Sequence, residues 1–133
     1  GQHDYGPADR TFAGNPLSQD PDRFGIMERY FRAFPDMTVG GVTWGWLSAA
    51  MRSMREVRHF PYLGRITLPI LTLTGSLDRV TPARELERYL ACLPGADNIV
   101  VPGALHDVMN ETDACRAAAW WYIDRFMTRV MTA

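Results

Sequence analysis

The sequence has little of what several classes of protein require. The 133 residues carry a formal net charge of −1 and form no basic stripe, so a nucleic-acid partner is not expected. The longest apolar runs, such as residues 117–121, are far too short to cross a bilayer. No signal-peptide pattern is present. These absences predict a protein without a transmembrane segment.

Cysteine and histidine are also scarce. Cys92 and Cys115 fall in predicted helices, where two free thiols are expected rather than a disulfide, and this favours the cytoplasm. The three histidines, His3, His59 and His106, show no paired spacing, and the cysteines stand in no ligand motif. The sequence therefore predicts no metal site.

A nucleophile is missing as well. No Gly-x-Ser-x-Gly segment occurs, and none of the serines stands at a sharp elbow directly between a strand and a helix, as an exposed nucleophile would. These serines are Ser18, Ser48, Ser53 and Ser76, and we expect them to be caps, helix-surface residues or turn residues. The chain opens on Gly1 with a polar, turn-rich segment typical of a loop interior, so we expect a fragment.

What is present suffices for a packed core, because 47% of the residues are hydrophobic. Residues 1–20 are rich in turn formers and predict a surface loop. Apolar residues at three- and four-residue spacing predict helices over 21–34, with Asp20 as its cap, and over 43–57. Residues 59–67 read as a connector.

From Leu68 onward the pattern alternates between strands and helices. Strands are predicted over 70–74 and 99–101, with a helix over 82–93 capped by Thr81 and a final helix over 113–130. This alternation indicates a right-handed parallel crossover. Because two strands make a poor sheet, we expect strand 70–74 to pair on its other side with a strand from outside this sequence.

Each predicted strand is followed by a side chain that is common in catalytic sites. Asp78 comes shortly after the first and His106 after the second. Taken singly, they are typical of a solvated loop aspartate and a surface histidine. However, the carboxyl ends of parallel strands meet at one edge of a sheet, where ligands and catalytic groups gather. We therefore predict a hydrogen bond between the two, with the carboxylate holding the imidazole as in a nucleophilic triad.

The segment carrying this pair resembles a known fold. Residues 69–127 run strand, Thr-Gly-x-x-Asp-x-Val-x-Pro, helix, strand, Pro-Gly-x-x-His and long helix, which is similar to the C-terminal end of the α/β-hydrolase fold. The aspartate and histidine of that pattern match Asp78 and His106. Residues 15–24 and 40–47 resemble the cap of its lysophospholipase and monoglyceride-lipase branch, and residues 102–111 are consistent with that branch.

The resemblance implies an α/β protein that forms the C-terminal portion of an α/β-hydrolase fold. A helical cap or lid would span residues 1–64, and β-α-β-α with parallel strands would span residues 65–133. The activity implied is hydrolysis of a carboxylic ester, either a lysophospholipid or a monoacylglycerol, by serine hydrolase chemistry. Asp78 and His106 would serve as catalytic residues without any cofactor, while the missing N-terminal half, as partner, would supply the nucleophile.

The apolar face of helix 43–57 is the candidate site for a small apolar ester substrate. It carries Trp44, Trp46, Leu47 and Met51, which either bind an acyl chain or pack as the core of a cap. Two other functions remain open. An aspartate nucleophile in the missing half would indicate dehalogenase or epoxide-hydrolase chemistry, and a non-catalytic binding domain would use the Trp/Met face for a partner.

Overall fold

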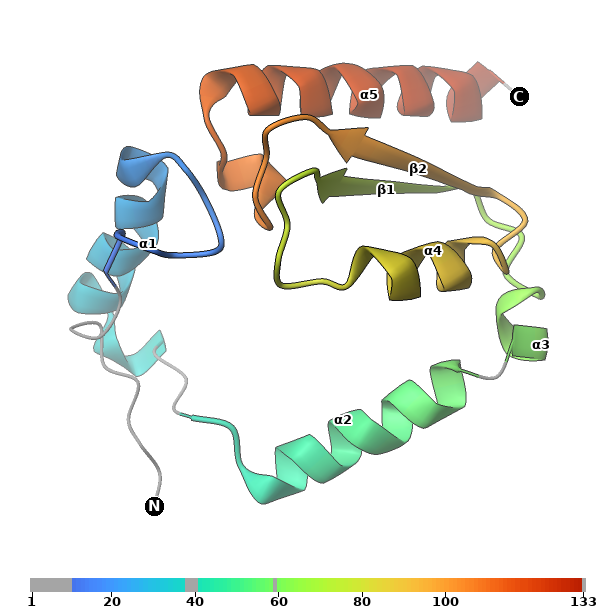
Figure 1. Cartoon of the computed structure of the whole chain (residues 1–133), viewed down its shortest axis with the longest axis horizontal. Coiled ribbons are helices and arrows are strands. Elements are labelled where there is room, and N and C mark those ends of the chain that lie inside the picture. Colours follow the sequence, from blue (N-terminus) through green and yellow to red (C-terminus); the bar gives the residue numbers. More distant parts are fainter. Residues whose placement is uncertain (1–10, 38–40, 59, 133) are drawn as a thin grey trace.

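The structure, a computed structural model, describes residues 11–37, 41–58 and 60–132 (Figure 1). His3, His59 and residues 1–10 of the predicted loop lie outside this part of the chain. The helices are α1 (Pro21–Ala33), α2 (Trp44–Val57), α3 (Phe60–Leu63), α4 (Ala83–Leu90) and α5 (Asp113–Thr132). The strands are β1 (Ile70–Gly75) and β2 (Ala96–Val101), and short 3-10 turns cover Pro35–Met37 and Val108–Asn110.

Helix starts follow the predicted capping residue at one of the two places where a cap was predicted. Asp20 accepts the Asp22 and Arg23 amides at 3.0 and 2.9 Å, which confirms it as the cap of α1. The prediction for Thr81 is wrong, because α4 begins one residue later than expected and has no side-chain cap. The Thr81 amide donates to Asp78 Oδ1 at 3.1 Å, so Thr81 belongs to the turn that precedes the helix.

The connector expected at residues 59–67 contains the short helix α3. Leu63, the last residue of this helix, is buried, whereas the residues on either side of it are exposed. Burial of Leu63 stabilises this helical turn against the rest of the protein. Hydrophobic periodicity cannot predict so short an element.

The two strands form a parallel pair, as predicted. Ile70 aligns with Ala96 at one end of the register, and Gly75 aligns with Val101 at the other. Figure 1 shows α5 on one face of this pair and α4, the crossover helix, on the other. Within the described residues the sheet has only these two strands, so the outer edge of β1 has no strand beside it. The expected pairing of that edge with another strand stays a prediction.

The core lies at the carboxyl ends of the strands, where they meet the start of α5. Its buried members are Val101, Ala104, Val108, Cys115 and Ala119. The two cysteines are free, as expected. Because Ala104 and Val108 flank the loop that carries His106, the best-packed part of the molecule lies directly under the candidate site.

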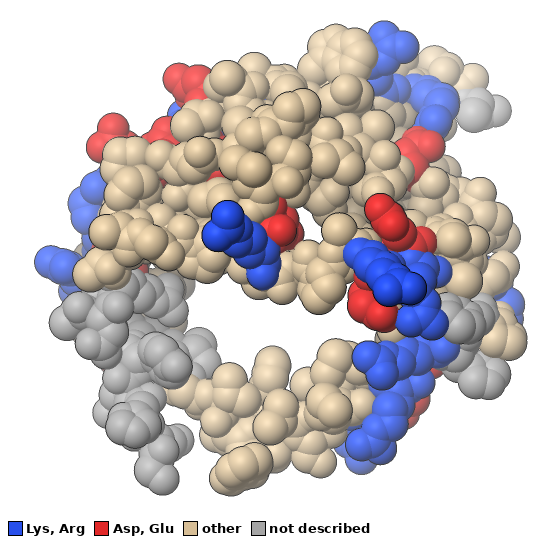
Figure 2. All heavy atoms as spheres, viewed as in Figure 1, with Lys and Arg blue, Asp and Glu red and all other residues tan. Residues whose placement is uncertain are grey.

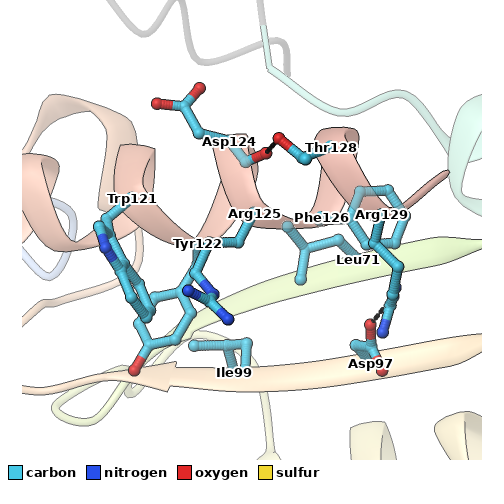
Figure 3. A pocket seen from close by; sticks show the side chains of 10 residues that line it. All are labelled: Leu71, Asp97, Ile99, Trp121, Tyr122, Asp124, Arg125, Phe126, Thr128 and Arg129. Atoms are coloured by element: carbon cyan, nitrogen blue, oxygen red, sulfur yellow. Dashed lines mark hydrogen bonds and ion pairs between the residues drawn. The ribbon is translucent and has the colours of Figure 1, made fainter. Parts of the chain in front are cut away.

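Away from this core, much apolar surface is open. A groove of about 690 Å³ runs between α5 and the strands (Figure 3). Leu71 and Ile99 form part of its floor, and the Arg125 guanidinium lies 4.8 Å from the centre of the Trp121 ring at its side. Such a face on a small sheet is typical of a surface that packs against further structure.

Helix α2 lies farthest from the sheet in Figure 1. Its apolar face is exposed, with Trp44 at 87%. Among the helices of the described ranges, none combines the length and the apolar character needed to span a membrane.

The core position at the end of β2 makes a specific prediction about stability. Val101 is fully buried, whereas its neighbour Val100 points to the other face and is 52% exposed. Val101→Ala should lower the free energy of unfolding by about 2 kcal/mol, through lost burial and the cavity left behind. Val100→Ala should change it by about 0.5 kcal/mol or less. Urea unfolding of the protein that carries this chain measures both, and equal losses would contradict this assignment of the core.

Candidate active site

Asp78 lies in the tight turn that follows β1. Its amide donates to the Gly75 carbonyl at 3.1 Å, which closes the turn. Its Oδ1 accepts the Val80 and Thr81 amides at 2.7 and 3.1 Å. The side chain is only 8% exposed. The carboxylate is therefore fixed by backbone donors before any other side chain reaches it.

His106 lies in the loop after β2, and this loop is bonded to the one that carries Asp78. The Gly103 amide donates to Ser76 Oγ at 2.8 Å, and the Leu77 amide donates to the Ala104 carbonyl at 2.9 Å. Gly103 takes a positive φ of 76°, which suits glycine and turns the chain back toward β1.

The two side chains meet as the sequence predicted. Asp78 Oδ2 lies 3.0 Å from His106 Nδ1. Because an ionised carboxylate can only accept, Nδ1 carries a proton, and in the neutral ring Nε2 then keeps its lone pair. The imidazole is 37% exposed, against 8% for the carboxylate. The carboxylate therefore lies inside and the ring faces outward, which leaves Nε2 free to take a proton from an incoming group.

The surroundings of Asp78 favour its charged form. Burial of the carboxyl group opposes ionisation, but hydrogen bonds from His106 and from the Val80 and Thr81 amides outweigh it, so the pKa of Asp78 falls below its ordinary value of 3.8. At neutral pH the carboxylate is ionised and can stabilise a protonated imidazole.

Gly75 makes the close approach of the two loops possible. A Cβ at this position would lie 2.0 Å from the Leu105 carbonyl oxygen and 2.3 Å from that of Ala104. Both contacts are with backbone, which cannot move aside easily. Only glycine fits here, because the loop bearing His106 crosses directly over it.

The segment before α1 is more than the surface loop that we expected. Asn15 Oδ1 accepts the Leu17 and Ser18 amides at 2.9 and 3.0 Å, and Ser18 is buried. The His106 amide donates to the Pro16 carbonyl at 3.4 Å. The expectation of a surface loop is therefore wrong for Ser18, which is buried, and incomplete for residues 15–17, which pack against the loop after β2. Asn-Pro signalled a turn, but nothing local showed where that turn would pack.

Glu111 was also missed by the sequence analysis. Its side chain is fully buried beside the loop that carries His106. A buried glutamate is rare unless it is paired, so its burial could not have been foreseen from residue type.

The other candidate residues lie away from the pair. Trp44, Trp46, Leu47 and Met51 are exposed on α2, and the molecule is hollowed between this helix and the sheet layer (Figure 2). Their role in substrate binding stays a prediction. Two serines have other partners, since Ser18 Oγ donates to the Asn110 carbonyl and Ser76 accepts from Gly103. In the part of the chain that is described, no serine bonds to His106, and no cluster of three potential metal ligands occurs.

Known proteins resemble this chain in sequence and in fold. Residues 15–113 match the family described as "Serine aminopeptidase, S33". The chain is 26% identical over 113 residues to the probable lysophospholipase L2 of Haemophilus influenzae, covering 85% of this chain and 36% of that protein. It is 27% identical over 125 residues to lysophospholipase L2 of Escherichia coli K12, covering 89% and 36%.

A solved structure shares the fold. It is a soluble variant of monoglyceride lipase from Saccharomyces cerevisiae in complex with a substrate analogue, with a TM-score of 0.67 and 14% identity. The match covers 95% of this chain and 45% of that one. The two parallel strands and their helices thus align with less than half of an α/β-hydrolase fold, and the chain spans about a third of the length of its curated relatives.

Substitution of Gly75 should separate the two loops. Gly75→Ala forces a Cβ against the Leu105 and Ala104 carbonyls, so it should cost about 1–3 kcal/mol of stability, as overpacking does. It should also lengthen the distance from Asp78 Oδ2 to His106 Nδ1. Thermal unfolding and a crystal structure of the variant measure the two effects. Gly45→Ala is the matched control, because its Cβ would meet nothing nearer than 4.0 Å. Unchanged stability in Gly75→Ala would contradict the close approach.

The lowered pKa of Asp78 predicts a dependence of stability on pH. Because the folded protein favours the ionised form, this carboxylate contributes stability at pH values above 3.8, and the contribution is lost as the pH falls through the folded pKa. Asp78→Asn removes it, so the free energy of unfolding should fall less steeply below pH 3.8 than in the wild type. Urea unfolding at a series of acidic pH values tests this, and parallel curves for the two proteins would be inconsistent with it.

Proposed function

The chain belongs to the serine aminopeptidase S33 family of α/β-hydrolases, and on that premise we propose that it forms the acid–base part of a carboxylic ester hydrolase. One observation carries the proposal, the hydrogen bond between Asp78 and the Nδ1 of a half-exposed His106. It leaves a neutral imidazole nitrogen pointing outward from a rigid loop, which is the arrangement that activates a hydroxyl nucleophile.

In the proposed reaction, a serine from a part of the protein outside this sequence attacks the ester carbonyl. His106 Nε2 takes the serine proton and later gives it to the leaving alcohol. Asp78 stays ionised throughout, keeps the proton on Nδ1 and stabilises the imidazolium. Water then attacks the acyl-enzyme, with His106 again as the base, and releases the acid.

Esters are the favoured substrate class. The relatives are named as lysophospholipases and the structural neighbour as a monoglyceride lipase, and both names denote hydrolysis of glycerol esters of fatty acids. The Trp/Met face of α2 adds an apolar surface that suits an acyl chain, with Trp46, Leu47 and Met51 exposed on it. We propose a lysophospholipid or a monoacylglycerol as the substrate, and these residues as its acyl-chain contacts.

The nucleophile and the oxyanion donors would come with the rest of the fold. We propose that this part pairs with the outer edge of β1 and covers the groove between α5 and the strands, where Trp121 is half exposed (Figure 3). Parallel sheets are normally covered on both faces and paired on both sides.

The activity test uses the protein in which this chain is joined to the remainder of the fold. His106→Ala should abolish nearly all hydrolysis of a lysophospholipid or monoacylglycerol, because no base remains. Asp78→Asn should lower kcat by roughly 10⁴, through loss of the correct imidazole tautomer. Asp36→Asn changes an exposed aspartate and is the matched control. Release of fatty acid measures the rate, and an aminoacyl anilide offered in parallel should be cleaved far more slowly.

Two results would overturn the proposal. The first is a protein that cleaves the anilide and leaves both lipid esters intact. The second is robust, fluorophosphonate-sensitive hydrolysis of a short p-nitrophenyl ester by the 133-residue chain alone, because no nucleophile is expected within it.

A further inference from the structure

Glu111 is a buried carboxylate that forms no ion pair, although the Arg23 guanidinium donates to its backbone carbonyl at 3.0 Å. Its side chain has no exposed surface, and among the ion pairs of the described residues none involves it. Burying a charge in this way is costly unless hydrogen bonds compensate. A leucine of similar size would fill the same space without that cost. The cost of burying this carboxylate must therefore be offset by the groups that it binds.

Glu111 binds the backbone of three segments. Its Oε1 accepts the Leu105 amide at 2.8 Å and the Gln19 amide at 3.3 Å, and its Oε2 accepts the Thr112 amide at 3.0 Å. Leu105 directly precedes His106, Gln19 lies just before α1, and Thr112 lies just before α5. One side chain thus joins the loop of the candidate base to the starts of two helices.

We propose that Glu111 is a positioning residue for His106. It fixes the peptide on the N-terminal side of His106 through the Leu105 amide. Through Gln19 it also holds residues 16 and 17 against the other side of the loop, where the Pro16 and Leu17 carbonyls accept the His106 and Asp107 amides at 3.4 and 2.8 Å. The Gln19 side-chain amide adds a bond to the Gly103 carbonyl. The loop is therefore clamped from both sides, and Glu111 is the group common to both.

The consequence for the reaction rests on the proposed function. Asp78 fixes the ring through Nδ1 but leaves the backbone of His106 free to move. Misplacing a catalytic group by about 1 Å can cost a factor on the order of 100 in rate. A clamp that lies outside the substrate site should affect this placement, and hence kcat, without affecting KM.

The test compares Glu111→Gln and Glu111→Leu in the protein that carries this chain with the rest of the fold. Glutamine has one accepting oxygen where glutamate has two, so it leaves one buried amide without an acceptor, and leucine leaves all of them. We expect kcat to fall about 10-fold for Gln and about 100-fold for Leu, with KM unchanged. The downfield Nδ1 proton resonance of His106 should broaden, and the Leu105 amide should exchange faster, in the same order.

Leu63→Ala is the control for a loss of stability alone. It removes a buried side chain at the end of α3, a helix outside the segments that Glu111 joins. It should lower stability while leaving kcat and the His106 resonance as in the wild type. Equal effects of Leu63→Ala and Glu111→Gln would overturn the proposal, because Glu111 would then act only through stability.

The outcome can be separated from the proposed activity. If Glu111→Leu does not fold, Glu111→Gln decides, and an unchanged resonance together with unchanged Leu105 exchange would overturn the proposal. If the wild type hydrolyses no ester, the proposed function fails while the resonance and the exchange rate still report whether Glu111 positions His106.

Discussion

The close crossing of two loops at Gly75 is the constraint on which the rest of the site depends. A side chain there would meet the Leu105 and Ala104 carbonyls at 2.0 and 2.3 Å. Because the crossing is that tight, the backbone bonds between the loops can form, and with them the 3.0 Å contact between Asp78 and His106. The small core beneath, around Val101 and Ala104, stiffens the same region. The best-buried residues and the Asp78–His106 pair therefore lie at the same edge of the sheet.

Burial falls off steeply away from that edge. Val101, Ala104 and Ala119 are fully buried, whereas most of α2 and the outer face of α5 are exposed. A sheet of two parallel strands cannot cover itself, since each parallel strand needs neighbours and helices on both faces. The chain aligns with 45% of a known α/β-hydrolase. The apolar surfaces are thus exposed because this chain spans only part of the fold.

The sequence predicted the elements whose signals are local. Apolar spacing located α1, α2 and α5, the apolar runs located β1 and the second half of β2, and Asp20 marked the start of α1. The Asp78 and His106 contact was predictable as well, because parallel strands deliver their following residues to one edge. Two expectations failed for different reasons. Thr81 was expected to cap α4, but this helix begins after Pro82 without a side-chain cap, and the Thr81 amide donates to Asp78 three residues before it. Residues 15–18 looked like open loop, although they pack against the loop after β2, some ninety positions along the chain.

Two carboxylates hold His106 by different means, and the difference explains why only one was recognisable. Asp78 bonds to the ring itself, so its role follows from the chemistry of a charged imidazole. Glu111 bonds mainly to backbone amides, with a longer contact to the Gln19 side chain, and nearly every residue type carries a backbone amide. Its role is set by where three segments converge, which a linear pattern does not encode. A buried carboxylate that satisfies several amides at once can replace many weaker contacts. In a loop as short as that between Val101 and Val108, one such carboxylate is enough to restrict the backbone next to a histidine.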